Sequence, residues 1–479
     1  MTDSLRPVRI AMLAHSTNPR GGVVHAIELA DSLTRLGHEA VVHAPDASGK
    51  GFFRAPLSPA VAVMAEPAGK DIAAMVQARI ADYVRHFEPH ANRRFDLFHA
   101  QDAISGNALA TLKQRGLIRH FARTVHHIDS FSDPRLSDWQ ARSITEADEL
   151  FAVSALWQAE ITSAFGRPST IIGNGVDTAR FGNGARAADQ EVRERYGING
   201  SRVLLAVGGI EERKNTIRIL EAFRQVLNIH RDAQLVIAGG ASLLDHAAYR
   251  RQFEAQLSTD AVLHRAVICL GPVPDPDMPS LYRLADALIF PSIKEGFGLV
   301  VLEAMASGTP VVTSRIAPFT EYLHENDVVW CDPWSVGSIA NAIAMALTEP
   351  LHSRLAQRGV LVARQHDWSN TARAHLPAYQ RLLELQHAGD AVSYPLAGWR
   401  DRAMLFAFAG DQGSSSGRRH LSGGGIHAAQ PHGADDRERS RAREIRLCLF
   451  AGDGATRKAG SRRPAFRGVI GRGRNRHII

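Results

Sequence analysis

The sequence of 479 residues has few of the features that mark secreted, membrane-spanning or metal-dependent proteins. Its three cysteines, Cys269, Cys331 and Cys448, are odd in number and have no Cys-x-x-Cys spacing, which argues against a disulfide framework and a structural zinc site. We therefore expect buried free thiols. No apolar run reaches the roughly 18 residues of a membrane span, and the hydrophobic stretch near the start is too short for a signal peptide. These absences predict a cytoplasmic protein without a transmembrane segment.

The positive net charge of +7 is concentrated at one end of the chain. Residues 400–479 contain 17 Lys and Arg against 7 Asp and Glu, so the remaining residues, with 39 basic and 42 acidic side chains, are slightly acidic. The segment 390–479 is rich in Gly, Ser and Arg and has little periodic apolar content, which predicts disorder. Its Arg and Gly content is the one suggestion of RNA binding, but aromatic residues are few there. We expect no nucleic acid to bind the folded part.

Strand-like apolar segments alternate with helical patterns in two series, from VRIAMLA to STII and from VLLAVGG to VVWCD. This alternation is typical of βαβ units and parallel sheets covered on both faces, so the predicted fold class is α/β with two doubly wound, Rossmann-like domains. In such domains the ligand binds at the carboxyl ends of the strands, here in a central cleft. The predicted parts are an N-terminal domain at 1–180, a linker at 181–200, a second domain at 201–365, a helix crossing back to the first domain at 366–389, and the tail at 390–479.

A glycine pair follows the first predicted strand and precedes a helix. Gly21 and Gly22 would let the backbone approach a ligand closely, and the free N–H groups at the start of the helix suit an anion. A tight turn without a ligand explains the pair equally well. The second domain repeats the design, because Gly208 and Gly209 end its first strand.

Two cations follow this second glycine turn. Arg213 and Lys214 are adjacent, just before a predicted helix, and a planar guanidinium beside a point charge suits a diphosphate. The alternative is a solvated basic helix start, which is common in proteins.

The segment EGFGLVVLE places Glu295 and Glu303 on either side of a Gly-Phe-Gly turn and the start of a predicted helix at 298–306. Eight helical residues span about 12 Å, whereas paired glycosidase carboxylates are roughly 5 to 9.5 Å apart. The spacing is therefore awkward for a hydrolytic pair and favours two grips on one elongated ligand. An unpaired glutamate on a helix surface is the weaker alternative.

Taken together, these motifs resemble a known family. They are the Gly-Gly loop near the N-terminus, the strand end Thr124-Val125-His126, the NGVD segment at 174–177, the second-domain Gly turn with its lysine, GPVPDPDMPSLYRLADALIFPS, and FPSIKEGFGLVVLEAMASGTPVV. Over about residues 7–385 the sequence resembles the retaining GT-B glycosyltransferases of glycosyltransferase family 4. The segment with the two glutamates is the most specific element, and the glycine turns appear in the right order.

The resemblance implies site residues in both domains. In the first, Gly22 would lie near the transferred group, and His126 would line the site beside the donor sugar, with His127 as the rival for that role. In the second, the implied contacts are Gly208, Arg213 and Lys214 with the diphosphate, Glu295 with the sugar, the backbone of Phe297, Gly298 and Leu299 with sugar and phosphate, Glu303 with the ribose, and Val273 with the nucleobase.

The resemblance also implies an activity. A retaining glycosyltransferase of the hexosyltransferase type would move a sugar from a nucleotide diphosphate sugar to a small-molecule, glycan or lipid acceptor. The two cations and the helix N-terminus would stabilise the leaving diphosphate, so we expect no metal and no cofactor. No Asp-x-Asp motif stands in a context suited to a metal-bound donor.

Two departures from the family pattern leave alternatives open. Family members usually carry Arg where this sequence has Gly209, so one phosphate contact is missing, and the tail beyond 390 has no counterpart in the family. The alternatives are a nucleotide-sugar epimerase or a glycosyl phosphorylase on the same fold, or a nucleotide-sugar-binding protein without turnover.

Overall fold

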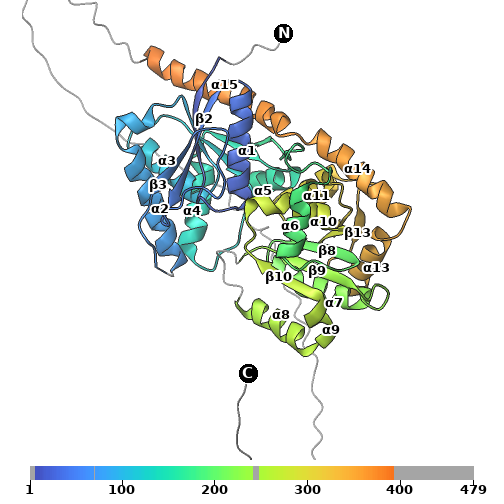
Figure 1. Ribbon diagram of the computed structural model, residues 1–479. Helices are drawn as coiled ribbons and strands as arrows, with labels where there is room; N and C mark the ends of the chain where they lie inside the picture. The colour runs from blue at the N-terminus through green and yellow to red at the C-terminus, as the bar shows by residue number, and fades with distance from the viewer. Residues whose placement is uncertain (1–5, 70, 241–246, 393–479) are drawn as a thin grey trace, which may run out of the picture. The chain divides into compact units, whose positions relative to one another are not determined.

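The computed structural model describes residues 6–69, 71–240 and 247–392 (Figure 1). These residues belong to one compact unit, Met1–Arg400. Cys448 and the part of the predicted tail from residue 393 on lie outside the described residues. The described residues form two parallel sheets with helices packed on them, which confirms the predicted α/β fold class.

The first sheet has, in the described part of the chain, seven strands in the order β3-β2-β1-β4-β5-β6-β7, and every pair is parallel. The central β1 pairs with both neighbours, since Ile10 is opposite Ala40 on one side and Leu97 on the other. The strands are β1 (Arg9–Leu13), β2 (Glu39–Asp46), β3 (Ala60–Met64), β4 (Leu97–Ala100), β5 (Ala122–Val125), β6 (Glu149–Ala152) and β7 (Thr170–Ile171).

The helices of this half, apart from the first, begin where the sequence offers a side-chain cap. Ser105 N donates to Asp102 Oδ1 at 2.8 Å, and Ser154 caps the next but one helix in the same way. Each of these caps stands two residues after the end of a strand, so these helix starts lie at the carboxyl edge of the sheet. The helices are α1 (Gly21–Arg35), α2 (Ile72–Phe87), α3 (Ala103–Gln114), α4 (Pro134–Thr145) and α5 (Ala155–Phe165), with a short 3-10 helix at His90–Arg93.

The second sheet has the order β10-β9-β8-β11-β12-β13, again parallel throughout. Its strands are β8 (Arg202–Val207), β9 (Ala233–Ala238), β10 (Val267–Gly271), β11 (Ala287–Phe290), β12 (Val311–Ser314) and β13 (Val329–Cys331). Its helices are α7 (Thr216–Val226), α8 (Ala247–Thr259), α9 (Ala261–Ala266), α10 (Met278–Leu284), α11 (Leu299–Ala306), α12 (Phe319–Tyr322), α13 (Val336–Ala346) and α14 (Leu351–Gln365), with 3-10 turns at Glu212–Lys214 and Asp275–Asp277.

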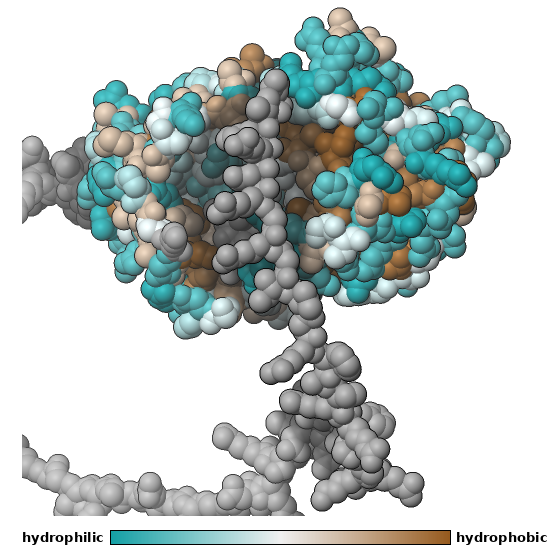
Figure 2. Space-filling view, turned by 60° about the horizontal axis from the view of Figure 1, so that its bottom comes forward, coloured by the Kyte–Doolittle hydropathy of each residue, from teal (hydrophilic) through white to brown (hydrophobic). Residues whose placement is uncertain are grey.

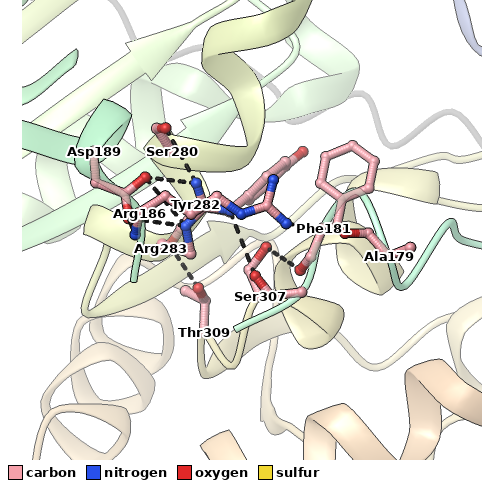
Figure 3. A network of polar contacts seen from close by, with 10 residues as sticks. Ala179, Phe181, Arg186, Asp189, Ser280, Tyr282, Arg283, Ser307 and Thr309 are labelled. Atoms are coloured by element: carbon pink, nitrogen blue, oxygen red, sulfur yellow. Dashed lines mark hydrogen bonds and ion pairs between the residues drawn. The ribbon is translucent and has the colours of Figure 1, made fainter. Parts of the chain in front are cut away.

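The segment between the sheets is held by polar contacts to the second half (Figure 3). It includes helix α6 (Ala187–Arg195), which packs against α10. Asp189 in α6 accepts a bond from Arg283 Nε in α10 at 2.9 Å, and Arg186 donates to the carbonyl of Ala179 at 3.0 Å. This part of the predicted linker is therefore ordered against one half of the molecule.

The chain passes between the two halves at two neighbouring places. Val176 N donates to His366 O at 2.8 Å, and a Cβ at Gly175 would lie only 2.5 Å from Trp368 N, so glycine permits the close approach. Helix α15 (Trp368–Val392) then runs beside α1 and also contacts β4 (Figure 1). In this way the last described helix is anchored on the first sheet.

The expectation of buried thiols holds for Cys331 and is wrong for Cys269, which is exposed. Cys269 lies in β10, an edge strand of the second sheet with no buried residue, whereas Cys331 Sγ contacts Thr313 O at 3.4 Å inside the sheet. No helix among the described residues has both the length and the apolar composition needed to cross a membrane. The face drawn in Figure 2 is mainly hydrophilic with separate hydrophobic patches.

Candidate active site

The loop after β5 meets the loop before α11, and the meeting point joins predicted site residues of both halves. A Cβ at Gly296 would lie 2.7 Å from His126 O, and Trp157 Nε1 donates to Gly296 O at 2.9 Å. Lys294 Nζ donates to Ile128 O at 3.0 Å. The glycine after Glu295 is therefore needed for the contact between the two loops.

His126 is partly buried between α1 and β4. Its Nε2 lies 3.2 Å from Gln101 Oε1, its ring meets that of His25 edge-on at 4.8 Å, and a Cβ at Gly22 would lie 3.3 Å from its Cδ2. Gly22 is thus placed beside His126, while the roles of both residues at the donor sugar stay predictions. Burial holds the pKa of His126 well below its usual 6.5, and neighbouring positive groups lower it further, so the ring is neutral at physiological pH. Burial likewise lowers the pKa of His25 to about 4.

His127, the rival, has a different environment. Its side chain is half exposed, and its Nε2 contacts Asp129 Oδ2 at 3.0 Å. That contact gives the imidazole a surface carboxylate as its partner. The contacts with Gly22 and Gln101 belong to His126 and favour it for the role beside the donor sugar.

The two predicted phosphate cations and the predicted sugar-binding glutamate form one cluster. Lys214 Nζ lies 2.6 Å and Arg213 Nη1 3.1 Å from Glu295 Oε1. Lys214 also lies over the ring of Phe290, 4.2 Å from its centroid. Burial lowers the pKa of Lys214 despite the carboxylate. For Glu295, burial alone would raise the pKa, but Lys214 and Arg213 outweigh it, so the net shift is downward and the group is ionised.

The glycine turn after β8 shapes the space around this cluster. Gly208 has φ of 126°, and a Cβ there would lie 2.6 Å from Lys214 Cε, so glycine allows the lysine to lie across the turn. Gly209 has φ of 80°, and its Cβ would lie 2.5 Å from Gly240 O. The departure from the family pattern therefore has a local reason: this backbone leaves no room for a side chain at 209.

Helix α11 begins beside the cluster with a constrained turn. Gly298 precedes its first residue, Leu299, with φ of 93°, and a Cβ there would lie 2.5 Å from the ring of Phe319. Phe297 stacks on Tyr322 with centroids 4.6 Å apart, and Tyr322 Oη donates to Phe297 O at 3.1 Å. The turn therefore fixes the start of α11, where backbone N–H groups without a helical partner favour an anion.

Glu303 lies in α11 with partners different from those of Glu295. Tyr282 Oη donates to its Oε2 at 2.6 Å, and burial raises the pKa of Glu303, with smaller effects from Arg180 and Asp275. Tyr282 is itself held, because Thr309 Oγ1 donates to its carbonyl at 2.6 Å (Figure 3). Glu295 and Glu303 have pKa shifts in opposite directions, which also occurs in catalytic acid–base pairs. The different hydrogen-bond partners of the two glutamates, and not their pKa shifts, therefore distinguish two grips on one ligand from an acid–base pair.

Val273 lies at the edge of this region. It follows β10, is partly buried and packs against the core. Two residues later, Asp275 forms an ion pair with Arg180 at 2.7 Å. Among the described residues, no group of three or more His, Cys, Asp or Glu side chains is placed to hold a metal ion.

Several residues at the site are absent from the sequence prediction. Gln101, Tyr282 and Tyr322 contact predicted residues through hydrogen bonds, and His25 does so through its ring. Gln101 directly follows β4, and its place at the carboxyl end of a strand is the signal that could have found it.

Two parallel-sheet, Rossmann-like halves are the architecture of the GT-B class. Residues 19–180 match the sequence profile described as Glycosyltransferase Family 4, and residues 188–373 match that described as Glycosyl transferases group 1. The chain belongs to this family of glycosyltransferases. The predicted retaining, nucleotide-sugar-dependent class is thereby confirmed at the level of the family.

Curated relatives carry several different activities. The chain is 33% identical over 271 residues to a glycogen synthase of Mycobacterium tuberculosis, covering 54% of this chain and 57% of that enzyme. It is 29% identical over 430 residues to D-inositol 3-phosphate glycosyltransferase 2 of Catenulispora acidiphila, covering 79% of this chain and 96% of the relative. The first match thus spans little more than half of the glycogen synthase, and the substrates of this chain are a matter for proposal.

Solved structures share the fold. Sucrose-phosphate synthase from Thermosynechococcus elongatus superposes with a TM-score of 0.66 at 20% identity, covering 79% of this chain and all of that one. Anabaena HepE in complex with UDP-glucose superposes with a TM-score of 0.61 at 20% identity, covering 80% of this chain and 100% of that one. At this identity the likeness concerns the fold alone.

Proposed function

We propose that this protein transfers a sugar, with retention at the anomeric carbon, from a nucleotide diphosphate sugar to an acceptor hydroxyl. The observation that carries the proposal is the cluster of Lys214, Arg213 and Glu295 beside the N-terminus of α11, joined through Gly296 to His126 of the other half. Cations that face a helix N-terminus suit a diphosphate, and a neutral histidine beside an ionised carboxylate suits sugar hydroxyls.

Departure of the nucleotide diphosphate puts negative charge on the distal phosphate. Lys214, the guanidinium of Arg213 and the N–H groups at the start of α11 would stabilise that charge as it develops. Glu295 keeps the two cations oriented when no phosphate is near them, because it bonds to both. With the diphosphate bound, we expect the cations to turn toward phosphate and Glu295 to accept hydrogens from the sugar.

Glu303 would bind the ribose of the donor. A carboxylate can accept about four hydrogen bonds, and the Tyr282 hydroxyl uses one of these positions. Ribose hydroxyls would take the others, and Val273 would lie beside the nucleobase. This assignment gives the two glutamates separate parts of one ligand.

The identity of donor and acceptor is best approached by experiment. The HepE complex makes UDP-glucose the first donor to test. The acceptor would be a small molecule, glycan or lipid that enters from the side of the first sheet, and a cytoplasmic location remains our expectation. A thermal-shift screen of uridine, guanosine and adenosine diphosphate sugars would identify the donor.

Product analysis then separates the alternatives. Turnover that needs an acceptor and gives a product of unchanged anomeric configuration supports the transferase. Epimerised donor without acceptor indicates an epimerase, and turnover that needs inorganic phosphate indicates a phosphorylase. Donor binding without turnover against a broad acceptor panel would contradict the proposal in favour of a binding protein.

A further inference from the structure

The side-chain amide of Gln101 lies between the buried Met12 and the partly buried His126. Its Nε2 donates to Met12 Sδ at 2.8 Å and also lies 3.4 Å from His99 Nε2, and its Oε1 lies 3.2 Å from His126 Nε2. Gln101 follows β4 and is 2% exposed, while Met12 lies in β1 and is fully buried. The amide therefore spans two neighbouring strand ends and reaches the histidine beyond β5.

Met12 favours one of the two orientations of this amide. A thioether sulfur accepts hydrogen bonds weakly and has no hydrogen to donate. With the amide reversed, Oε1 would face the sulfur and two acceptors would be in contact, whereas the observed orientation gives each end a suitable partner. The sulfur thus favours the orientation in which the amide oxygen points at His126.

The orientation of the amide in turn selects the tautomer of His126. An amide oxygen can only accept, so Nε2 must carry the ring hydrogen and donate it to Gln101 Oε1. The depressed pKa of His126 means that the ring carries a single hydrogen. In the described part of the chain, Nε2 is the one nitrogen of this ring with a hydrogen-bond partner, which leaves the Nδ1 lone pair for a ligand.

We propose that Gln101 is a positioning residue that holds His126 as the Nε2–H tautomer, so that Nδ1 accepts a hydrogen bond from a hydroxyl of the donor sugar. This inference rests on the proposed function for the identity of the ligand, but the tautomer itself does not depend on it. The inference adds a chemical requirement to the site, because the sugar hydroxyl that faces His126 must donate a hydrogen bond to Nδ1. A sugar whose group at that position can only accept a hydrogen bond is disfavoured.

The tautomer is directly measurable. Protein labelled with 15N-histidine would be studied at pH 8 by long-range proton–nitrogen correlation, with His126 assigned from its loss in His126→Gln. The expected spectrum shows a protonated Nε2 and an unprotonated Nδ1. Gln101→Met, which has no amide oxygen, should lose the preference. A protonated Nδ1 in the natural protein, or an unchanged pattern in Gln101→Met, would overturn the inference.

Met12→Leu tests the preceding step. Leucine and methionine are similar in volume, so the core should tolerate the exchange, while the sulfur that orients the amide is lost. We expect a mixture of the two His126 tautomers in this variant. Retention of a pure Nε2–H pattern would show that Met12 does not set the orientation.

Kinetics with UDP-glucose, or with the donor that the screen identifies, give the functional readout. Gln101→Met should lower kcat/KM for the donor about 10-fold. Donor analogues in which one hydroxyl not adjacent to the anomeric carbon is replaced by hydrogen or by fluorine identify the hydroxyl that donates to His126. Fluorine cannot donate a hydrogen bond, so at that one position the fluorinated donor should react as slowly as the deoxygenated donor. Equal kinetics in Gln101→Met and the natural protein, or rescue by fluorine at every such position, would contradict the role. If no donor turns over, the proposed function fails and the spectra still decide the tautomer.

Discussion

Lys214→Met separates the structural and the chemical role of the ion cluster. The Lys214 side chain is 11% exposed and that of Glu295 7%, so the substitution leaves a buried carboxylate without its closer cation. Removing one partner of a buried pair costs about 3–5 kcal/mol. Because the half-exposed Arg213 stays 3.1 Å from the same oxygen, we expect a loss of about 2–3 kcal/mol in the free energy of unfolding.

The same substitution should affect turnover more strongly than stability. A cation aimed at the leaving phosphate corresponds to an oxyanion-hole donor, whose removal lowers kcat by about 100- to 1,000-fold. At about 2–4 °C per kcal/mol, the stability loss should lower the melting temperature by roughly 5–10 °C, so the variant remains folded for assay at 25 °C. Thermal unfolding and donor consumption measure the two effects.

Two further variants make the test decisive. In Lys214→Met combined with Glu295→Gln, neither partner leaves a buried charge, so stability should largely return while turnover stays low. Lys113→Met is the matched control, since Lys113 also has a carboxylate partner, Asp148 at 2.8 Å, and lies over the ring of Phe121, but outside the cluster. Turnover within threefold of the natural protein in Lys214→Met would refute the phosphate role. A double variant no more stable than the single one would refute the buried-pair argument.

Three further substitutions test the geometry around the donor. Gly298→Ala places a Cβ 2.5 Å from the Phe319 ring at a φ of 93°, and we expect a loss of at least about 2 kcal/mol in chemical denaturation; an unchanged midpoint would show that the turn can relax. Glu303 has a pKa above its ordinary 4.5, so its contribution to stability is complete below that pH and is lost as pH rises through the raised value. Glu303→Gln, which cannot ionise and can still accept from Tyr282, should therefore gain stability relative to the natural protein between pH 5 and 8, while donor KM rises about 10-fold; parallel stability curves would contradict this. Gly209→Arg, which restores the usual family residue, should lower the melting temperature and not improve donor affinity, and tighter donor binding in a thermal shift would show the backbone argument to be wrong.

The strands were predictable where burial makes them continuously apolar. β1, β4 and β11 lie inside their sheets and are almost entirely hydrophobic, with Arg9 and His99 as the exceptions, as expected for parallel strands covered on both faces. The edge strand β3 also has a wholly apolar sequence, AVAVM, although only one of its residues is buried, so an apolar run alone does not distinguish a central strand from an edge strand. Helix α6 lies within the segment predicted as a linker. Local sequence did not indicate this helix, because its contact with Arg283 joins residues that are 94 positions apart.

In the site, too, local sequence indicates single residues but not the contacts between distant residues. Arg213, Lys214 and Glu295 stand at strand ends or helix starts, where local pattern alone indicates an anion or sugar site. Their dependence on one another is not local, because Lys214 and Glu295 are 81 residues apart and their contact needs the register of β8 beside β11. Gln101 is similar: its position is visible in the sequence, but its function depends on a sulfur and an imidazole from other strands.

The opposite environments of the two glutamates follow from where the start of α11 lies. Glu295 precedes that start, in the loop that meets the first half, so it needs cations to remain ionised after leaving water, and those cations are the ones a diphosphate needs. Glu303 lies one turn into α11, where a neutral hydroxyl is its partner and the raised pKa reflects burial without a cation in contact. A diphosphate at the helix start would compete with Glu295 for Lys214 and leave Glu303 undisturbed. Donor binding should therefore replace the cation contacts of Glu295 and add hydrogen bonds to Glu303. This is the arrangement needed to hold the sugar and the ribose of one ligand on opposite sides of its phosphates.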